Sequence, residues 1–172
     1  MKRIIINPTN CTGCMSCSIA CMQAHREAEG NLYDLGLTDP ANESRNKILL
    51  NANGQFKPLF CRHCAQPKCV AACMSGALTK NPDTGFVRYD ADKCGSCFMC
   101  VMSCSFGVPK PDAATRTRVV KCDFCVNDND EPNCVKRCPS GTITVEAYPR
   151  EACCATAQGH SANELQANER EV

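Results

Sequence analysis

The most distinctive chemistry in this sequence lies in its cysteines, which recur in closely spaced groups. The first group occupies CTGCMSCSIAC, with cysteines at positions 11, 14, 17 and 21. The chain contains 18 cysteines among 172 residues, a density at which thiol chemistry rather than a large apolar core organises a fold. Soft thiolate ligands suit zinc, copper(I) and iron–sulfur clusters. The spacing therefore indicates metal ligation.

Sixteen of the 18 cysteines fall into four sets that share two spacings. Each set opens with C-x2-C and closes with C-x3-C, whereas the gap between the two pairs varies. Cys153 and Cys154 fall outside the sets. In chain order the sets are Cys11, Cys14, Cys17 and Cys21; Cys61, Cys64, Cys69 and Cys73; Cys94, Cys97, Cys100 and Cys104; and Cys122, Cys125, Cys134 and Cys138.

The shared spacings suggest how one set could serve two metal centres. The opening pair suits a tight loop around a metal centre, and the closing pair suits a helical turn, because residues three to four apart lie on one helix face. The third cysteine would bind the centre beside its loop, while the fourth would point toward a second centre. C-x2-C-x2-C-x3-C is the ligand pattern of bacterial ferredoxins, in which the fourth cysteine ligates the other cluster of a pair. Four sets therefore predict four [4Fe–4S] clusters.

Three other uses of the cysteines remain open at this point. Zinc ribbons also use C-x2-C pairs, although the C-x2-C-x2-C loop is unusual for them and the chain has just three histidines, His25, His63 and His160. A disulfide scaffold is disfavoured by the lack of signal-peptide features. A metallothionein-like thiol store is disfavoured by the regular spacing. The iron–sulfur interpretation is the one that the spacing favours.

Composition and charge narrow the classes further. The formal net charge is +1, so no field that would attract nucleic acid is implied. No run of 18 apolar residues occurs, so we expect no direct membrane insertion. The start, MKRIIINPTN, has three consecutive apolar residues and no twin-arginine pair, unlike an export signal. We therefore expect a cytoplasmic protein, where a reducing environment favours metal over disulfides.

Short strand and turn signals surround the cysteine sets. The expected elements are a strand at 3–6, a helix at 18–29 that ends at Gly30, hairpin strands at 77–79 and 86–89, and strands at 118–120 and 142–145. Residues 31–53 read as a polar, solvated insertion loop. The predicted fold class is α+β, with tandem bacterial-ferredoxin-like modules in a domain at 1–150 and a C-terminal tail at 151–172.

With the four sets in place, the sequence resembles the four-cluster electron-transfer subunits of oxidoreductase complexes. This family includes the beta subunits associated with dimethyl sulfoxide reductase and formate dehydrogenase, and ferredoxin-like subunits of formate hydrogenlyase and carbon monoxide dehydrogenase. The order of the sets carries the resemblance over about residues 2–147: CRHCAQPKCVAAC has a widened gap, CGSCFMCVMSC is regular, and CDFCVNDNDEPNCVKRCP has a long gap and closes with Cys138-Pro139. Met22, Met74 and Ser105 stand where the family usually has proline after the closing cysteine.

The resemblance implies that the first and fourth sets share two clusters and that the second and third sets share two more. The implied ligands are Cys11, Cys14, Cys17 and Cys138 (cluster 1); Cys122, Cys125, Cys134 and Cys21 (cluster 2); Cys61, Cys64, Cys69 and Cys104 (cluster 3); and Cys94, Cys97, Cys100 and Cys73 (cluster 4). Positive charge beside a ligand would favour the reduced cluster, unless the side chain merely lies on a solvated face. The basic residues in such positions are Lys68, Lys93, Lys121, Lys136 and Arg137.

The resemblance further implies a relay of single electrons rather than an enzyme. No G-x-G-x-x-G or P-loop motif is present, so no nucleotide site is evident. The implied partner is a large catalytic oxidoreductase subunit, and CGSCFMCVMSCSFG most resembles subunits that accompany carbon monoxide dehydrogenase. A tungsten or molybdenum aldehyde or formate oxidoreductase, or a hydrogenase, is the alternative. A flavin- or NAD-linked acceptor subunit or self-association could complete the assembly. The tail, with Cys153 and Cys154, reads either as free thiols or as a docking element.

Overall fold

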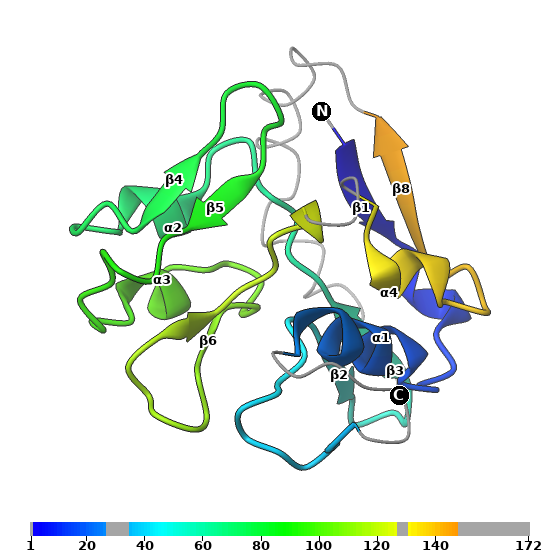
Figure 1. Ribbon diagram of the computed structural model, residues 1–172. Helices are drawn as coiled ribbons and strands as arrows, with labels where there is room; N and C mark the ends of the chain where they lie inside the picture. Colours follow the sequence, from blue (N-terminus) through cyan, green and yellow to red (C-terminus); the bar gives the residue numbers. More distant parts are fainter. Residues whose placement is uncertain (1, 27–34, 127–130, 148–172) are drawn as a thin grey trace, which may run out of the picture.

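Short strands, paired in twos, carry the cysteine loops in the computed structural model, which describes residues 2–26, 35–126 and 131–147. Within these ranges the strands form four two-stranded antiparallel sheets. Figure 1 shows two groups of elements, one around β4, β5, α2 and α3 and the other around β1, β8, α1 and α4. Helical turns beside antiparallel pairs make the fold α+β, as predicted.

The two ends of the described chain meet in one sheet. Strand β1 (Lys2–Ile6) pairs with β8 (Ile143–Ala147), and Ile4 lies opposite Val145. A single 3₁₀ turn, η1 (Pro8–Asn10), follows β1. Helix α1 (Ser16–His25) carries the end of the first cysteine set and packs against α4 (Asn133–Lys136) of the fourth. The strands predicted at 3–6 and 142–145 are therefore confirmed, and their pairing brings the first and fourth sets together.

The middle of the chain forms the second group of elements. Strands β4 (Leu78–Lys80) and β5 (Val87–Tyr89) make the predicted hairpin. The helical turns α2 (Lys68–Ala71) and α3 (Met99–Met102) belong to the second and third cysteine sets and pack against each other. Strand β7 (Val119–Val120) was predicted, but its partner β6 (Lys110–Pro111) was not.

The first helix differs from its predicted bounds. It begins at Ser16 rather than at residue 18, because Met15 turns the chain with a left-handed φ of 59° just before it. It ends at His25, and Arg26 is already extended with ψ of 146°. The helix was predicted to reach residue 29 and to stop at Gly30. This prediction is wrong, because the helix has already ended before Arg26. Residues 27–34 lie outside the described part of the chain.

The predicted insertion loop at 31–53 is wrong at residues 47–50, which form a strand. Strand β2 (Lys47–Leu50) pairs with β3 (Phe56–Leu59) to form a hairpin. The Oδ1 atom of Asn51 accepts the N–H groups of Asn53 and Gln55, which closes the turn between the strands. Asn46, just before β2, is 3% exposed and accepts a 2.7 Å hydrogen bond from Ser18. Residues 42–48 are therefore partly or fully buried near α1, whereas residues 49–53 stay exposed to solvent, as predicted.

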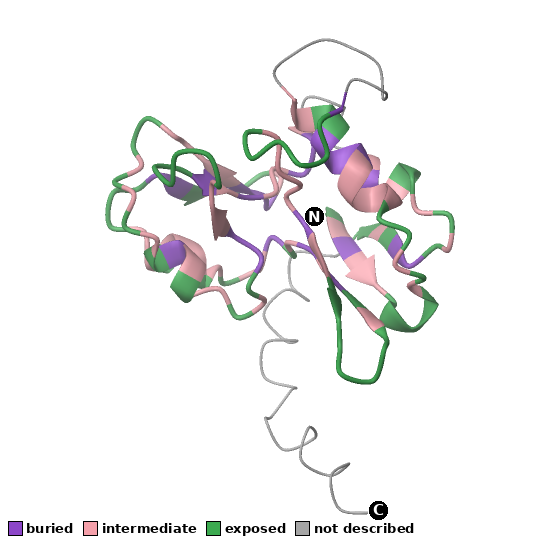
Figure 2. Ribbon diagram, turned by 90° about the horizontal axis from the view of Figure 1, so that it is seen from below, coloured by how far each residue is buried: buried purple, intermediate pink, exposed green. Residues whose placement is uncertain are grey.

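Aromatic residues from the middle of the chain complete the core between its ends. Phe60 and Phe86 pack with Ile4, Phe124 and Ile143 in one buried cluster. The rings of Phe86 and Phe124 are stacked with centroids 4.2 Å apart. Figure 2 shows buried segments on both groups of elements. The two groups therefore share a core.

A second buried cluster lies within the middle group and contains Leu78, Val87, Cys100 and Val119. It packs partly buried cysteines of the second and third sets against the β4–β5 hairpin. In the described ranges, no helix has both the length and the apolar character needed to cross a membrane.

Candidate metal centres

Each cysteine loop contains backbone in the left-handed conformation. The residues with positive φ in or beside the loops are Gly13 and Met15 in the first set, His63 in the second, Ser96 and Phe98 in the third, and Phe124 and Cys125 in the fourth. Alternation of right- and left-handed residues turns successive N–H groups toward one side, and such concave nests bind anions and iron–sulfur groups. The loops are therefore shaped to surround a negatively charged centre.

Helical turns position the later cysteines of each set. Cys17 and Cys21 both lie in α1, as the closing spacing predicted. In the other three sets the third cysteine lies in a four-residue helix, whereas the fourth lies beyond its end. The expectation that both closing cysteines share a helix face is therefore wrong for these sets, because α2, α3 and α4 end before the fourth cysteine. The chain turn after the helix directs the fourth cysteine instead.

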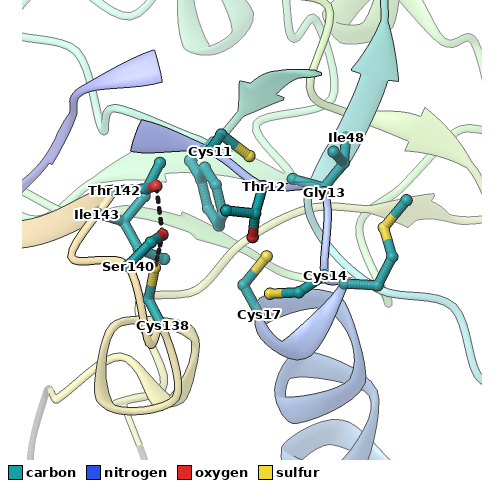
Figure 3. Close-up of a pocket in the computed structure, with 12 residues that line it drawn as sticks. Cys11, Thr12, Gly13, Cys14, Cys17, Ile48, Cys138, Ser140, Thr142 and Ile143 are labelled. Atoms are coloured by element: carbon teal, nitrogen blue, oxygen red, sulfur yellow. Dashed lines mark hydrogen bonds between the residues drawn. The ribbon is translucent and has the colours of Figure 1, made fainter. Parts of the chain in front are cut away.

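The first and fourth sets meet at a solvent-open hollow. Figure 3 shows Cys11, Cys14 and Cys17 facing Cys138 across this space, with Ser140, Thr142 and Ile143 beside Cys138. The three cysteines come from the loop before α1 and its first turn, and Cys138 follows α4. These four are the residues grouped as cluster 1.

The second and third sets meet at a similar hollow. Its lining includes Cys94, Cys97 and Cys100 together with Cys73, which comes from the preceding set. The amide of Leu78 donates a 3.4 Å hydrogen bond to the Sγ atom of Cys73. These four cysteines are the residues grouped as cluster 4, and the arrangement repeats that of the first hollow.

Electrostatic effects among thiols show that the remaining cysteines also gather in two groups. Burial raises the pKa of Cys64, and nearby Cys61 and Cys104 raise it further. The pKa of Cys69 is also raised, to about 11. Burial and the same two neighbours raise it, whereas the positive charge of Lys121 lowers it. The structure thus brings together the four cysteines grouped as cluster 3.

The group that corresponds to cluster 2 lies where α1 packs against α4. Burial raises the pKa of Cys134, and charge on Cys21 and Cys125 adds to the effect. Burial likewise raises the pKa of Cys122, with further contributions from Cys61 and Cys21. Because Cys61 acts on Cys122, the group of cluster 3 adjoins the group of cluster 2.

The thiols differ in how readily they ionise. Burial raises the pKa of Cys17 to about 11, and it also raises the pKa of Cys100. Burial has the same direction at Cys138, but hydrogen bonds from Ser140 and from backbone amides outweigh it, so the pKa of Cys138 is lowered. A thiol must lose its proton to bind a metal. The buried thiols therefore stay protonated until a cation is present to compensate the charge.

A group that the sequence did not reveal ties α1 to the fourth set. His25 donates from Nδ1 to the carbonyl of Cys21 (2.7 Å) and from Nε2 to Asp123 (3.0 Å). Burial is the largest single effect and lowers the pKa of His25, but the bond to Asp123 and the nearby Cys21 thiol together outweigh it and raise the pKa to about 10. Arg45 contacts the other oxygen of Asp123 at 2.6 Å. The ligand atoms of His25, Asp123 and Cys125 lie within 4.8 Å of one another, yet both ring nitrogens already donate, so the histidine has no lone pair for a metal.

The five basic residues beside ligands divide into two kinds. Lys121 is buried, with 4% of its surface exposed, and its Nζ atom donates to the carbonyls of Val87 (2.9 Å) and Cys122 (2.7 Å). The others lie on exposed faces: Lys68, Lys93, Lys136 and Arg137. Four of the five basic residues therefore lie on a solvated face, and Lys121 alone among them places its charge inside the protein.

The donor set and its surroundings fit iron–sulfur clusters. All sixteen cysteines of the four sets are free thiols, and sites built from thiolates alone select zinc, copper(I) or iron–sulfur clusters. Backbone amides point at ligand sulfurs, as from Arg45 to Cys21 at 3.2 Å and from Phe124 to Cys122 at 3.4 Å. Such N–H···S bonds are among the means by which proteins tune iron–sulfur clusters. Cys153 and Cys154 lie outside the described residues.

Comparison with known proteins identifies the family. A family described as the 4Fe-4S dicluster domain matches residues 52–148. The beta subunit of NADH-dependent phenylglyoxylate dehydrogenase from Aromatoleum evansii is 36% identical over 143 residues, which cover 81% of this chain and 29% of that protein.

Two further relatives come from Escherichia coli (strain K12). The iron–sulfur subunit of formate dehydrogenase-O is 30% identical over 155 residues, covering 81% of this chain and 51% of the relative. The B subunit of anaerobic dimethyl sulfoxide reductase is 33% identical over 141 residues, which cover 78% of this chain and 67% of the relative. The chain thus spans about half or less of the first two relatives and two thirds of the third. The resemblance seen in the cysteine sets is confirmed: this protein belongs to the 4Fe–4S dicluster domain family, and its cofactors are [4Fe–4S] clusters.

Proposed function

We propose that this chain is a non-catalytic electron-transfer subunit that holds four [4Fe–4S] clusters and passes single electrons between a catalytic oxidoreductase subunit and an acceptor protein. The observation that carries the proposal is the exchange of cysteines between sets. Cys138 joins Cys11, Cys14 and Cys17 at one hollow, and the closing cysteine of the second set joins the third set at another. We assign the sixteen thiols to clusters 1 to 4 in the groups given above.

The ligand chemistry favours electron transfer over substrate conversion. A [4Fe–4S] cluster with a thiolate on every iron exchanges one electron and offers no coordination site to a substrate. The chain's own contribution is to hold the thiolates and to donate hydrogen bonds to them. Amides of Arg45, Leu78 and Phe124 donate to sulfur, and each such bond favours the more negative, reduced form of a cluster.

We propose that the clusters form a row with both ends near the surface. Clusters 1 and 2 exchange ligands, as do clusters 3 and 4, and the effect of Cys61 on the pKa of Cys122 supports a junction between clusters 3 and 2. At the two ends, Cys14 and Cys97 are exposed. An exposed methionine lies within two residues of each of them, with Met15 40% and Met99 48% accessible. Electrons would then enter beside one end and leave beside the other.

The same arrangement supports a division of the chain. We propose a polyferredoxin domain at 1–150, made of two interleaved halves, one from the first and fourth sets and one from the second and third. The tail at 151–172 lies outside the described residues, and we propose it as a docking element for another subunit. A cytoplasmic location is proposed from the large number of free thiols, which a reducing compartment preserves.

The partner is proposed as the large catalytic subunit of an oxidoreductase. The relatives are named for phenylglyoxylate dehydrogenase, formate dehydrogenase and dimethyl sulfoxide reductase, so the same kind of subunit accompanies enzymes with different substrates. The third cysteine set favours carbon monoxide dehydrogenase, and a tungsten, molybdenum or hydrogenase partner is the alternative. Anaerobic co-purification followed by identification of the large protein would decide between them. Recovery of the chain without any oxidoreductase would count against the relay.

Substitution of one assigned ligand tests the cluster count. The wild-type chain, purified without oxygen, is expected to hold about sixteen iron atoms and as many acid-labile sulfides. Cys17→Ser removes a ligand of cluster 1, so it should lose or convert one cluster and destabilise the half that contains α1 and α4, because metal ligation contributes to folding. Cys153→Ser, outside the four sets, serves as the matched control and should keep all the iron.

Iron analysis also separates the proposal from its main competitor. Wild-type protein that contains zinc without iron or sulfide would establish a zinc-binding interaction module and end the relay proposal. Cys17→Ser protein with wild-type iron and an unchanged electron paramagnetic resonance (EPR) spectrum would leave the relay standing but refute the assignment of Cys17 to cluster 1.

A further inference from the structure

His63 presents a buried hydrogen-bond donor without a protein acceptor. The residue is 3% exposed, and its Nδ1 atom accepts the amide of Val87 at 2.9 Å. An Nδ1 atom that accepts a hydrogen bond carries no proton, so the neutral ring must bear its proton on Nε2. Nε2 is buried and has no hydrogen-bond partner among the described residues. A buried donor without an acceptor is destabilising because it has lost its hydrogen bonds to water, so an acceptor that is not a protein atom is expected there.

The surroundings of His63 lie between two of the proposed ligand groups. His63 stands between Cys61 and Cys64 in the second set, with a left-handed φ of 43°. Its ring meets the edge or face of Phe86 and Phe124, with centroids 5.4 and 5.5 Å apart. Phe124 in turn lies between Cys122 and Cys125 of the fourth set. The ring therefore occupies the place where the groups of clusters 3 and 2 adjoin.

Two residues at this junction hydrogen-bond to the backbone N–H and C=O groups of Val87. Its amide donates to His63, and its carbonyl accepts from the buried Lys121. The Nδ1 bond fixes the orientation of the imidazole, while Phe86 and Phe124 restrict it on two sides. The direction of the Nε2–H bond is thus set by the protein before any acceptor is bound.

We propose that His63 is a positioning residue whose Nε2–H donates a hydrogen bond to a sulfur of the cluster pair at the junction, cluster 3 or cluster 2. The inference rests on the proposed function, because the acceptor is a sulfur of a bound cluster. A donor to sulfur favours the more negative reduced form and so raises the reduction potential. His63 would therefore favour reduction of the cluster that it contacts, where the two halves adjoin.

The test uses the full-length chain purified anaerobically with its clusters and labelled with 15N-histidine. Two variants remove the labelled ring: His63→Phe keeps its aromatic shape without a donor, and His63→Gln keeps an N–H donor without the ring. Phe124→Leu disturbs the same packing and leaves the donor in place. EPR-monitored redox titration measures each cluster's potential, and electron–nuclear double resonance detects 15N and exchangeable-proton couplings to reduced clusters.

The expected outcome separates the hydrogen bond from packing. His63→Phe should shift one potential in the negative direction and abolish one 15N coupling and one exchangeable-proton coupling. His63→Gln should lose the same 15N coupling but shift the potential less, whereas Phe124→Leu should keep the coupling. The coupling from His25, which lies 3.7 Å from the sulfur of Cys21, remains as an internal reference.

Two failures are distinguishable. If the wild-type chain lacks iron and sulfide, the proposed function itself fails. If the chain holds its clusters but His63→Gln retains every wild-type 15N coupling, the inference about His63 is overturned while the relay stands. His63→Gln decides the question even if His63→Phe does not fold.

Discussion

Lys121 is a buried cation beside the fourth cysteine set, and its burial makes it sensitive to substitution. Lys121→Met keeps the aliphatic stem but removes the charge and leaves the carbonyls of Val87 and Cys122 without their donor. We expect a loss of about 1–3 kcal/mol in the free energy of unfolding, measured by urea denaturation. We also expect more negative potentials for clusters 2 and 3, because a nearby positive charge favours the reduced state.

Lys93→Met provides the matched control for this prediction. The side chain of Lys93 is 65% exposed and pairs with Asp90 at 2.9 Å, and exposed pairs contribute little to stability. Equal changes in both lysine variants would contradict the assignment of a special role to the buried charge.

At the scale of elements, a close approach between the first cysteine loop and the β2–β3 hairpin constrains Gly13. Gly13 has a left-handed φ of 70°, and a methyl group there would overlap the ring of Phe56. Gly54, in the turn of the same hairpin, has a φ of 74° but nothing within 4 Å of an added methyl group. Alanine at either position carries the left-handed cost of about 1–2 kcal/mol, and at Gly13 the overlap adds to it.

Iron content and stability should therefore respond differently to these two substitutions. Gly13→Ala displaces either Phe56 or the Cys11–Cys14 loop, so we expect it to lose the iron of one cluster during purification. Gly54→Ala should hold its full iron and be only modestly less stable in urea. Full iron in Gly13→Ala, at the stability of Gly54→Ala, would mean that the loop accommodates the methyl group without strain.

Local signals explain which elements could be predicted from sequence. The β4–β5 hairpin could be predicted because residue types that favour turns lie between two short, alternating apolar runs. Strand β6 has two residues, one of them Pro111, and β3 contains Pro58, so neither carries a clear strand pattern. The sixteen candidate ligand cysteines could be grouped into four sets from their spacing alone. The His25–Asp123 contact joins residues 98 positions apart, and no local pattern could reveal it.

At the scale of the whole molecule, the shared aromatic core should make the two halves unfold together. Phe86 is 2% exposed and stacks on Phe124, although the two residues belong to different halves. Phe86→Ala removes this contact, and we expect a loss of about 3–5 kcal/mol. Cluster absorbance and far-ultraviolet circular dichroism should then fall in one transition at a lower temperature.

Phe106→Ala is a suitable comparison, because Phe106 is partly exposed and lies 4.4 Å beneath the guanidinium of Arg62. It should shift the transition much less. If Phe86→Ala instead produced two separate transitions, with part of the cluster absorbance lost first, the halves would be independent units.

The pairing of β1 with β8 also affects the order in which the cluster sites can be completed during synthesis. A ribosome releases residues 2–6 long before residues 143–147, so β1 must wait for its partner while all the residues between them are made. With the proposed ligands, every thiol of clusters 3 and 4 emerges before Cys122, while clusters 1 and 2 need the last set to appear. Proteins fold progressively as they are made. Machinery that delivers iron and sulfide would thus encounter the sites of clusters 3 and 4 first and could complete those of clusters 1 and 2 only after the fourth set has emerged.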